Sequence, residues 1–336
     1  MNQNRSTPTR KDVAQLAGVS ETIVSYVLNN NRYVAQEKRI RVLQAVKQLH
    51  YHPNTVARAL RGKKSNHILF IADNISNEHF GKIVEEMDRI AYDKGYLISL
   101  LADRNDSEFV AQVNSRLVDG IVISSTGFEE KYVMDLIQSE VPMVLLMNRE
   151  YNMVGNKASR IYTGLQQGVK ECVKLLVEKG RRNILYIDRV SQHHRYSTTD
   201  DLRYNGFCTQ MAEYGLPVSS ENVISGYCSE EELYVGLQNR IHNGLKVDGI
   251  VGRNDNLACV AMAAVMACGL KVPQDISIIG FDNSRMSNYV KPTLTSMEID
   301  RTGIARAIIT MLDEMIAGNP PSVQAFDTKL IEREST

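Results

Sequence analysis

The segment RKDVAQLAGVSETIVSYVLNN, residues 10–30, predicts two short helices separated by a tight turn. Thr9 and Asp12 have the spacing of a capping box at the start of the first helix. Gly18 follows the apolar series of that helix, as a C-terminal cap glycine does, and Ser20 can cap the helix that comes next. Two helices joined by a Gly-Val-Ser turn are typical of a helix-turn-helix.

Apolar spacing assigns the core of this small unit and adds a third helix over about 36–49. The side chains expected to point inward are Val13, Leu16 and Ala17, then Ile23, Val24, Val27 and Leu28, and finally Ile40, Leu43, Ala45, Val46 and Leu49. A generic three-helix bundle is the alternative interpretation of the same pattern.

Charge separates this unit from the rest of the chain. Residues 1–66 hold 12 Lys and Arg against 3 Asp and Glu, a net charge of +9, although the whole chain has 39 of each class. The remaining residues are therefore acidic by the same amount. A basic head on an acidic body is typical of a nucleic-acid-binding protein, whereas a solvated basic terminus is the alternative.

The second helix carries the residues expected to read DNA. In a helix-turn-helix this helix enters the major groove, and the residues near its N-terminus meet the base edges. The side chains that we expect to face the bases are Glu21, Thr22, Ser25, Tyr26 and Asn29.

Residues 10–30, together with YVAQEKRIRVLQAVKQLHYHPNTVARAL at 33–60, closely resemble the headpiece of the lactose-repressor/galactose-repressor (LacI/GalR) family. The resemblance implies a hinge helix after Asn54 that forms when two protomers meet on their operator. It also implies that Leu60 opens a central base step from the minor groove and that Val56 faces the partner hinge. The further DNA contacts that it implies are Thr9, Ser20, Asn54 and Ala57.

Two positions depart from the headpiece pattern. Tyr26 stands where the family often has arginine or histidine, so the operator sequence is expected to differ from the usual one. Ala35 replaces the usual serine cap of the third helix, at a cost of roughly 1 kcal/mol.

From His67 onward, short apolar runs alternate with helical patterns, which predicts an α/β fold with doubly wound parallel sheets. The runs are HILFIAD, YLISLL, DGIVISS and PMVLLMN, followed by RNILYID, NVISG, DGIVGR and DISIIGF. Two such series predict two lobes, and ligands bind between lobes of this kind at the carboxyl ends of the strands.

The resemblance continues over this region through stretches such as SNEHFGKI, VPQDISIIGFDNS and LIEREST, and so covers essentially the whole chain. It implies a core like that of periplasmic sugar-binding proteins, with crossovers near Ile161, Pro292 and Ala325. The expected parts are a headpiece (1–52), a hinge and linker (53–66), an N-terminal lobe (67–161 plus about 292–325) and a C-terminal lobe (162–291 plus about 326–336).

The resemblance also implies an effector site. Arg203 in LRYNGF, Asn254 in RNDNLA and Asp282 in GFDNS match the residues that bind effectors in the family, and Phe80 matches an aromatic that packs on the ligand. Acid, amide, guanidinium and aromatic groups together suit a polyol. The two further effector-binding candidates are His79 and Met147.

Some positions of the cleft or the hinge between the lobes depart from the family. Met147 stands where an aspartate is usual, with Asn148 one step later, and Thr163-Gly164 replaces Asp-Asn. The effector is therefore expected to differ from a common sugar.

Several function classes lack their signatures. The chain has no GxGxxG, Walker A, HExxH or GxSxG motif, so we expect no enzyme. Its five cysteines form no CxxC pair, which predicts reduced thiols, no metal and no cofactor in a cytoplasmic protein. A transport binding protein would share the core fold but would carry a signal peptide and no basic head. No apolar run is long enough for a membrane span.

These features together predict a homodimeric repressor that binds a near-palindromic double-stranded operator under the control of a small effector. A carbohydrate is the expected effector. A purine remains open, as does a protein corepressor such as a phosphorylated sugar-transport carrier. The sequence does not decide whether the effector is an inducer or a corepressor, nor between dimer and tetramer.

Overall fold

The computed structural model describes residues 8–52, 64–219 and 221–336. Contacts divide the chain into two compact units, which meet in sequence between Ser65 and Asn66. We refer to them as the headpiece and the core, and each is described by itself.

The headpiece contains three helices, α1 (Arg10–Ala17), α2 (Glu21–Asn29) and α3 (Gln36–Gln48). The predicted capping box at Thr9 is present, and Gly18 adopts the left-handed conformation that ends α1. The Ser20 side chain accepts a hydrogen bond from the backbone of Ile23 and so caps α2. Ala35 precedes α3 without any side-chain cap. The caps therefore lie where the sequence predicts them.

The core of the headpiece differs from the prediction at three positions. Leu16, Ile40 and Leu43 were expected inside, yet they are 46%, 46% and 49% exposed. In α3 the buried side is formed by Val42 and Ala45. Several helical stripes of α3 are apolar enough to be buried, and packing against α1 and α2 selects only one of them.

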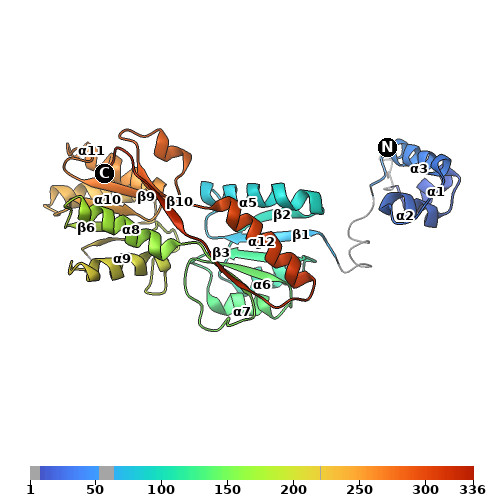
Figure 1. Ribbon diagram of the computed structural model, residues 1–336, viewed down its shortest axis with the longest axis horizontal. Coiled ribbons are helices and arrows are strands. Elements are labelled where there is room, and N and C mark those ends of the chain that lie inside the picture. Colours follow the sequence, from blue (N-terminus) through green and yellow to red (C-terminus); the bar gives the residue numbers. More distant parts are fainter. Residues whose placement is uncertain (1–7, 53–63, 220) are drawn as a thin grey trace, which may run out of the picture. The chain divides into compact units, whose positions relative to one another are not determined.

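The first sheet of the core has six parallel strands in the order β11-β5-β4-β3-β1-β2. Their bounds are β1 (His67–Ala72), β2 (Leu97–Ala102), β3 (Gly120–Ser124), β4 (Met143–Met147), β5 (Ser159–Tyr162) and β11 (Val323–Ala325). Helices α5 (Glu78–Ala91) and α12 (Arg301–Ile316) lie on one face, and α6 (Ser107–Asn114) and α7 (Glu130–Ile137) lie on the other (Figure 1).

The second sheet has the order β12-β10-β9-β8-β6-β7, and only β12 runs antiparallel. Its strands are β6 (Ile184–Ile187), β7 (Val223–Ile224), β8 (Gly249–Gly252), β9 (Ser277–Phe281), β10 (Thr295–Ile299) and β12 (Thr328–Ile331). Helices α8 (Leu165–Glu178) and α9 (Leu202–Glu213) pack together, as do α10 (Glu230–His242) and α11 (Asp255–Ala267). Two doubly wound lobes result, which confirms the predicted fold class.

The chain passes between the lobes after β5, after β10 and between β11 and β12 (Figure 1). The second passage lies later than the sequence predicted. Pro292 was expected to mark it, but Thr295–Ile299 pairs with β9 and β12 in the second sheet, and the chain leaves only at α12. Residues 295–299 (TSMEI) lack a continuous apolar run, so the sequence predicted neither this strand nor the sheet that it joins.

Helices α8 and α9 approach closely at Gly206, where a Cβ atom would lie 2.5 Å from the carbonyl oxygen of Gln166. Because that oxygen belongs to a helix backbone, we expect Gly206→Ala to lower the free energy of unfolding by roughly 1–3 kcal/mol. Urea unfolding measures this. Gly81→Ala is the control, since α5 leaves that position open. Equal stability of Gly206→Ala and wild type would contradict the close approach.

Candidate functional site

The predicted reading face of α2 is accessible to solvent. Glu21, Thr22 and Asn29 are exposed, and Ser25 and Tyr26 are half-buried. The Asn29 amide donates to the Ser25 hydroxyl at 3.1 Å, and the Arg32 guanidinium lies 5.2 Å from the centre of the Tyr26 ring. These polar side chains project from a helix whose other side is buried through Val24 and Val27.

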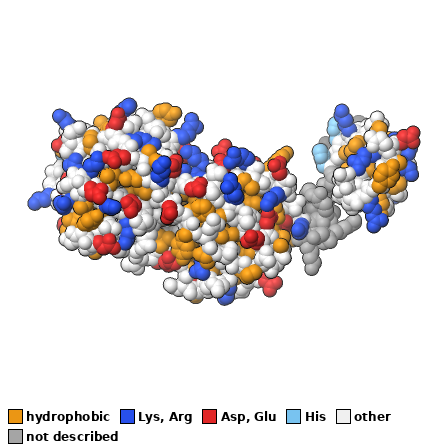
Figure 2. All heavy atoms as spheres, in the orientation of Figure 1, with side chains coloured by type: hydrophobic (Ala, Val, Ile, Leu, Met, Phe, Trp, Pro, Cys, Tyr) orange, Lys and Arg blue, Asp and Glu red, His pale blue; other side chains and the backbone are white. Residues whose placement is uncertain are grey.

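Thr9 and Ser20, also predicted to contact DNA, are exposed helix caps. Lys and Arg side chains are spread over the visible surface of this unit (Figure 2). The predicted hinge residues Asn54, Val56, Ala57 and Leu60 lie outside the described residues.

A cavity of about 780 Å³ lies between the two lobes of the core. We call it the cleft. Asp73, Asp103 and Asn148 follow strands of the first sheet, and Arg189 and Arg253 follow strands of the second. The cleft therefore lies at the carboxyl ends of both sheets, where doubly wound folds bind ligands.

Five of the six predicted effector-binding residues line the cleft: His79, Phe80, Arg203, Asn254 and Asp282. Met147 does not, because its side chain is completely buried in β4. Asn148, one residue later, lines the cavity instead and donates to the Ser124 hydroxyl at 3.1 Å. Because successive side chains of a strand point to opposite faces, the Met147 side chain points into the core and the Asn148 side chain points to the cleft.

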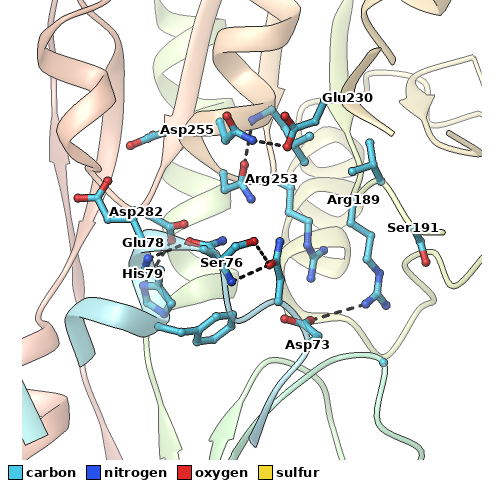
Figure 3. Close-up of a pocket in the computed structure, with 18 of the residues that line it drawn as sticks. Asp73, Ser76, Glu78, His79, Arg189, Ser191, Glu230, Arg253, Asp255 and Asp282 are labelled. Atoms are coloured by element: carbon cyan, nitrogen blue, oxygen red, sulfur yellow. Dashed lines mark hydrogen bonds and ion pairs between the residues drawn. The ribbon is translucent and has the colours of Figure 1, made fainter. Parts of the chain in front are cut away.

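Arg203 and Asp282 face each other at one end of the cleft. The Arg203 Nη2 atom lies 3.4 Å from the Asp282 carboxylate, and the guanidinium also covers the Phe281 ring. His79 Nδ1 lies 3.8 Å from the same carboxylate (Figure 3). Burial raises the pKa of Asp282, although Arg203 opposes the change. Burial and nearby cations hold the pKa of His79 well below its usual range, so this imidazole is neutral.

This end of the cleft has unused hydrogen-bonding capacity. Among the residues that the structure describes, Arg203 Nε, His79 Nδ1 and the Ser284 hydroxyl are buried without a hydrogen-bond partner. Buried polar groups are normally paired, so these three atoms are available to a polar ligand.

Asn254 and Phe80 have partly structural roles. The Asn254 side-chain oxygen caps α11 by accepting from the backbone of Leu257 at 2.9 Å, which leaves its amide nitrogen for a ligand. Phe80 is 7% exposed and packs against Phe70, so only a small part of its ring is open to the cleft.

The sequence did not single out Arg253, which is the most strongly paired cation of the cleft. It lies 2.8 Å from Asp201 and 3.7 Å from Asp188, and it donates to the Ser197 hydroxyl at 2.9 Å. Burial opposes its charge, but the two carboxylates outweigh burial and raise the pKa of Arg253. Arg253 lies next to Asn254 at the end of a predicted strand, and this position could have identified it as a cleft residue.

Arg189 and Arg195 reach from the second lobe to the first and were also missed. Arg189 donates to the Thr126 hydroxyl at 2.6 Å and lies 3.8 Å from Asp73. Arg195 donates to the carbonyl oxygen of Gly127 at 2.8 Å. Arg189 directly follows the motif YID and could have been found by the strand-end rule, whereas Arg195 lies in a polar loop without any signal.

Asp255 is a buried carboxyl group beside Asp282. Burial and the Asp282 carboxylate raise the pKa of Asp255 to about 7, against hydrogen bonds from the Ser296 hydroxyl and the Ser284 backbone amide. The folded state therefore holds this proton more tightly than the unfolded chain, and ionisation weakens folding as the pH rises from about 4 to about 7.

We expect Asp255→Asn to gain stability relative to wild type when the pH is raised from about 5 to about 8, because the amide cannot ionise. Urea unfolding of both proteins at the two pH values measures the gain. A constant difference between them would contradict the raised pKa.

Within the described ranges, no three His, Cys, Asp or Glu side chains are grouped so that they could hold a metal ion. Cys172 is a buried free thiol, and the other four cysteines are free and half-buried. No helix in the described part of the chain is long and apolar enough to cross a membrane.

Comparison with known proteins decides the family. Residues 9–54 match the model for bacterial regulatory proteins of the lacI family, and residues 173–336 match a periplasmic binding protein-like domain. The chain is 30% identical over 329 residues to the HTH-type transcriptional repressor PurR of Glaesserella parasuis serovar 5 (strain SH0165), covering 96% of this chain and 95% of that protein. The chain belongs to the LacI family. It is a DNA-binding transcriptional repressor and not an enzyme.

Other relatives of this LacI-family repressor agree. The PurR repressor of Serratia proteamaculans (strain 568) is 29% identical over 336 residues, covering 97% and 96% of the two chains. The lac repressor dimer bound to operator and the anti-inducer ONPF matches with a TM-score of 0.82 at 23% identity, covering 98% and 99%. The regulator CelR in complex with cellobiose matches with a TM-score of 0.71 at 22% identity, covering 98% and 100%. The lac repressor and CelR structures thus have the same fold as this chain.

Proposed function

We propose that this LacI-family repressor binds a near-palindromic operator as a homodimer and that a hydroxyl-rich carbohydrate in the cleft controls its affinity for DNA. The face formed by Glu21, Thr22, Ser25, Tyr26 and Asn29 reads the operator. The effector lies between Asp282, Arg203 and Asn254. The sign of its effect follows from whether it favours the DNA-binding state.

The polar lining of the cleft is the observation that supports a carbohydrate. Asp282 and Asn148 offer oxygen and amide groups to vicinal hydroxyls, and Arg203 and His79 offer unpaired nitrogens. Phe80 is the only Phe, Tyr or Trp among the described residues that line the cavity, and it is 93% buried. A ligand held mainly by hydrogen bonds suits such a lining better than one held by stacking.

The relatives named PurR favour a second candidate, a purine. A purine also carries donors and acceptors that Asp282 and Arg203 could pair with. It presents a flat aromatic face, however, and the described lining offers little aromatic surface to cover it.

A homodimer is proposed because a two-fold operator requires two recognition helices. An exposed leucine at the edge of a sheet also supports it. Strand β2 lies at the end of the first sheet, and Leu97 on it is 66% exposed. An uncovered edge strand of this kind favours pairing with another protein surface.

Thermal unfolding in the presence of single compounds tests the effector. Glucose, cellobiose, glucose 6-phosphate, hypoxanthine and guanine are the probes, because a compound that binds the folded state raises its melting temperature. We expect a sugar to give the largest rise in wild type and Asp282→Asn to lose it. A larger rise with a purine would favour the second candidate. A rise that persists in both Asp282→Asn and Arg203→Ala would contradict the assignment of the cleft.

A further inference from the structure

The effector residue Asp282 lies in a turn with an unusual backbone. Asp282 and Asn283 have φ values of 100° and 45°, in the left-handed region that residues other than glycine seldom adopt. Such backbone conformations are unfavourable and persist only where the surroundings hold them in place. Contacts that fix the backbone of this turn therefore also fix the position of the Asp282 carboxylate in the cleft.

Strand β10 holds one side of the turn. The Asp282 amide donates to the carbonyl oxygen of Met297 at 2.8 Å, and the Asn283 amide donates to the Ser296 hydroxyl at 2.9 Å. The Asn283 side chain donates to Glu298 at 3.1 Å. Strand β10 is the segment from which the chain passes to the first lobe, so the effector turn is bonded directly to a crossover.

Arg301 holds the other side, and it belongs to the opposite lobe. It is the first residue of α12, which packs against α5, β4 and β5 of the first lobe. Its Nη2 atom donates a hydrogen bond to the backbone carbonyl of Asp282. Arg301 does not line the cleft, and its Nε atom is buried without a hydrogen-bond partner among the described residues. It therefore acts from behind the effector site.

The charge of Arg301 also acts on the cleft. Burial is the largest influence on the pKa of His79, Asp282 and Glu78, and Arg301 lies close enough to lower all three. These residues come from both lobes. The charge of one guanidinium thus acts on groups from both lobes.

We propose that Arg301 is a positioning residue that couples occupancy of the cleft to the first lobe. This inference rests on the proposed function of the cleft. A ligand that bonds to the Asp282 carboxylate fixes the turn, and the carbonyl of the same residue holds Arg301 and hence the start of α12. Loss of Arg301 frees the turn from α12 without removing any group that touches the ligand. Allosteric coupling requires a structural element whose conformation depends on the occupancy of both the effector site and the DNA-binding site. The hydrogen bond between Asp282 and Arg301 joins the two lobes and can form part of such an element.

Hydrogen exchange of the full-length protein without ligand tests the link itself. In Arg301→Gln we expect faster exchange at the amides of Asp282 and Asn283 and at the start of α12. Arg301→Lys keeps a cationic donor and is expected to restore protection in part. Arg306→Gln is the control, because Arg306 is exposed on the same helix. Unchanged exchange in Arg301→Gln, or the same increase in Arg306→Gln, would overturn the proposal.

Operator binding tests the coupling. Affinity is measured by fluorescence anisotropy with and without saturating cellobiose, and again with hypoxanthine. For the probe that changes wild-type binding, we expect the ratio of the two affinities to fall to within about twofold of one in Arg301→Gln, from a typical coupling of about 5–150-fold. Operator affinity without the probe is expected to stay within about threefold of wild type, since the headpiece is untouched.

The outcomes separate a coupling role from a merely structural one. A lower melting temperature of Arg301→Gln with an unchanged affinity ratio would show that Arg301 only stabilises the core, and the proposal would fail. If neither probe changes wild-type binding, cellobiose and hypoxanthine are not effectors, and the exchange experiment still decides whether Arg301 holds the turn.

Discussion

Raising the salt concentration from about 50 to about 200 mM is expected to weaken operator binding by roughly 10³–10⁵-fold. Residues 1–66 carry 12 Lys and Arg against 3 Asp and Glu, a net charge of +9, and the proposed dimer presents this charge twice. About ten phosphate contacts would release their counterions. The logarithm of the binding constant should therefore fall with the logarithm of the salt concentration with a slope of about −9.

Fluorescence anisotropy with a labelled operator measures the slope. Arg104→Leu is a suitable control, because Arg104 is an exposed cation of the core and should leave the slope unchanged. A slope near zero, or tight binding of a single half-site by a monomer, would show that the headpiece charge does not drive the binding of DNA.

Removal of Arg253 is expected to give the largest loss of stability in the core. Arg253→Leu leaves the buried Asp201 and Asp188 carboxylates without their cation, and breaking a buried ion pair in this way costs about 3–5 kcal/mol. Urea unfolding measures the loss, and the exposed Arg104→Leu is again the matched control.

The double variant Arg253→Leu with Asp201→Asn separates charge from packing. It removes one of the two unpaired carboxylate charges, and an asparagine can still cap α9 as Asp201 does. We therefore expect it to be more stable than Arg253→Leu alone. If the double variant is less stable, lost packing rather than unpaired charge explains the effect.

The sequence predicts features that depend on neighbouring residues. The caps Thr9, Gly18 and Ser20 are local signals, and eight strands of the core are apolar runs, so both are found where expected. The polar strands β5, β10, β11 and β12 were not predicted, because they lack a continuous apolar run. Asp282 and Asn254 follow such runs, and their place at the cleft follows from the strand ends.

Features that depend on distant parts of the chain were missed. Arg253 resembles any other arginine until the loops that carry Asp188 and Asp201 fold around it. Met147 and Asn148 differ by one step in a strand, which is enough to exchange the core for the cleft. Leu43 belongs to one of several apolar stripes on α3, and only the packed headpiece shows that it is exposed.

Operator affinity of the wild type and of Arg203→Ala, measured with and without the sugar that stabilises the wild type most, tests the central claim. We expect the sugar to change wild-type affinity by about 5–150-fold and to leave Arg203→Ala unaffected. Without the sugar both proteins should bind the operator equally, because Arg203 belongs to the core and not to the headpiece. A full response in Arg203→Ala would show that control of DNA binding does not pass through this cleft.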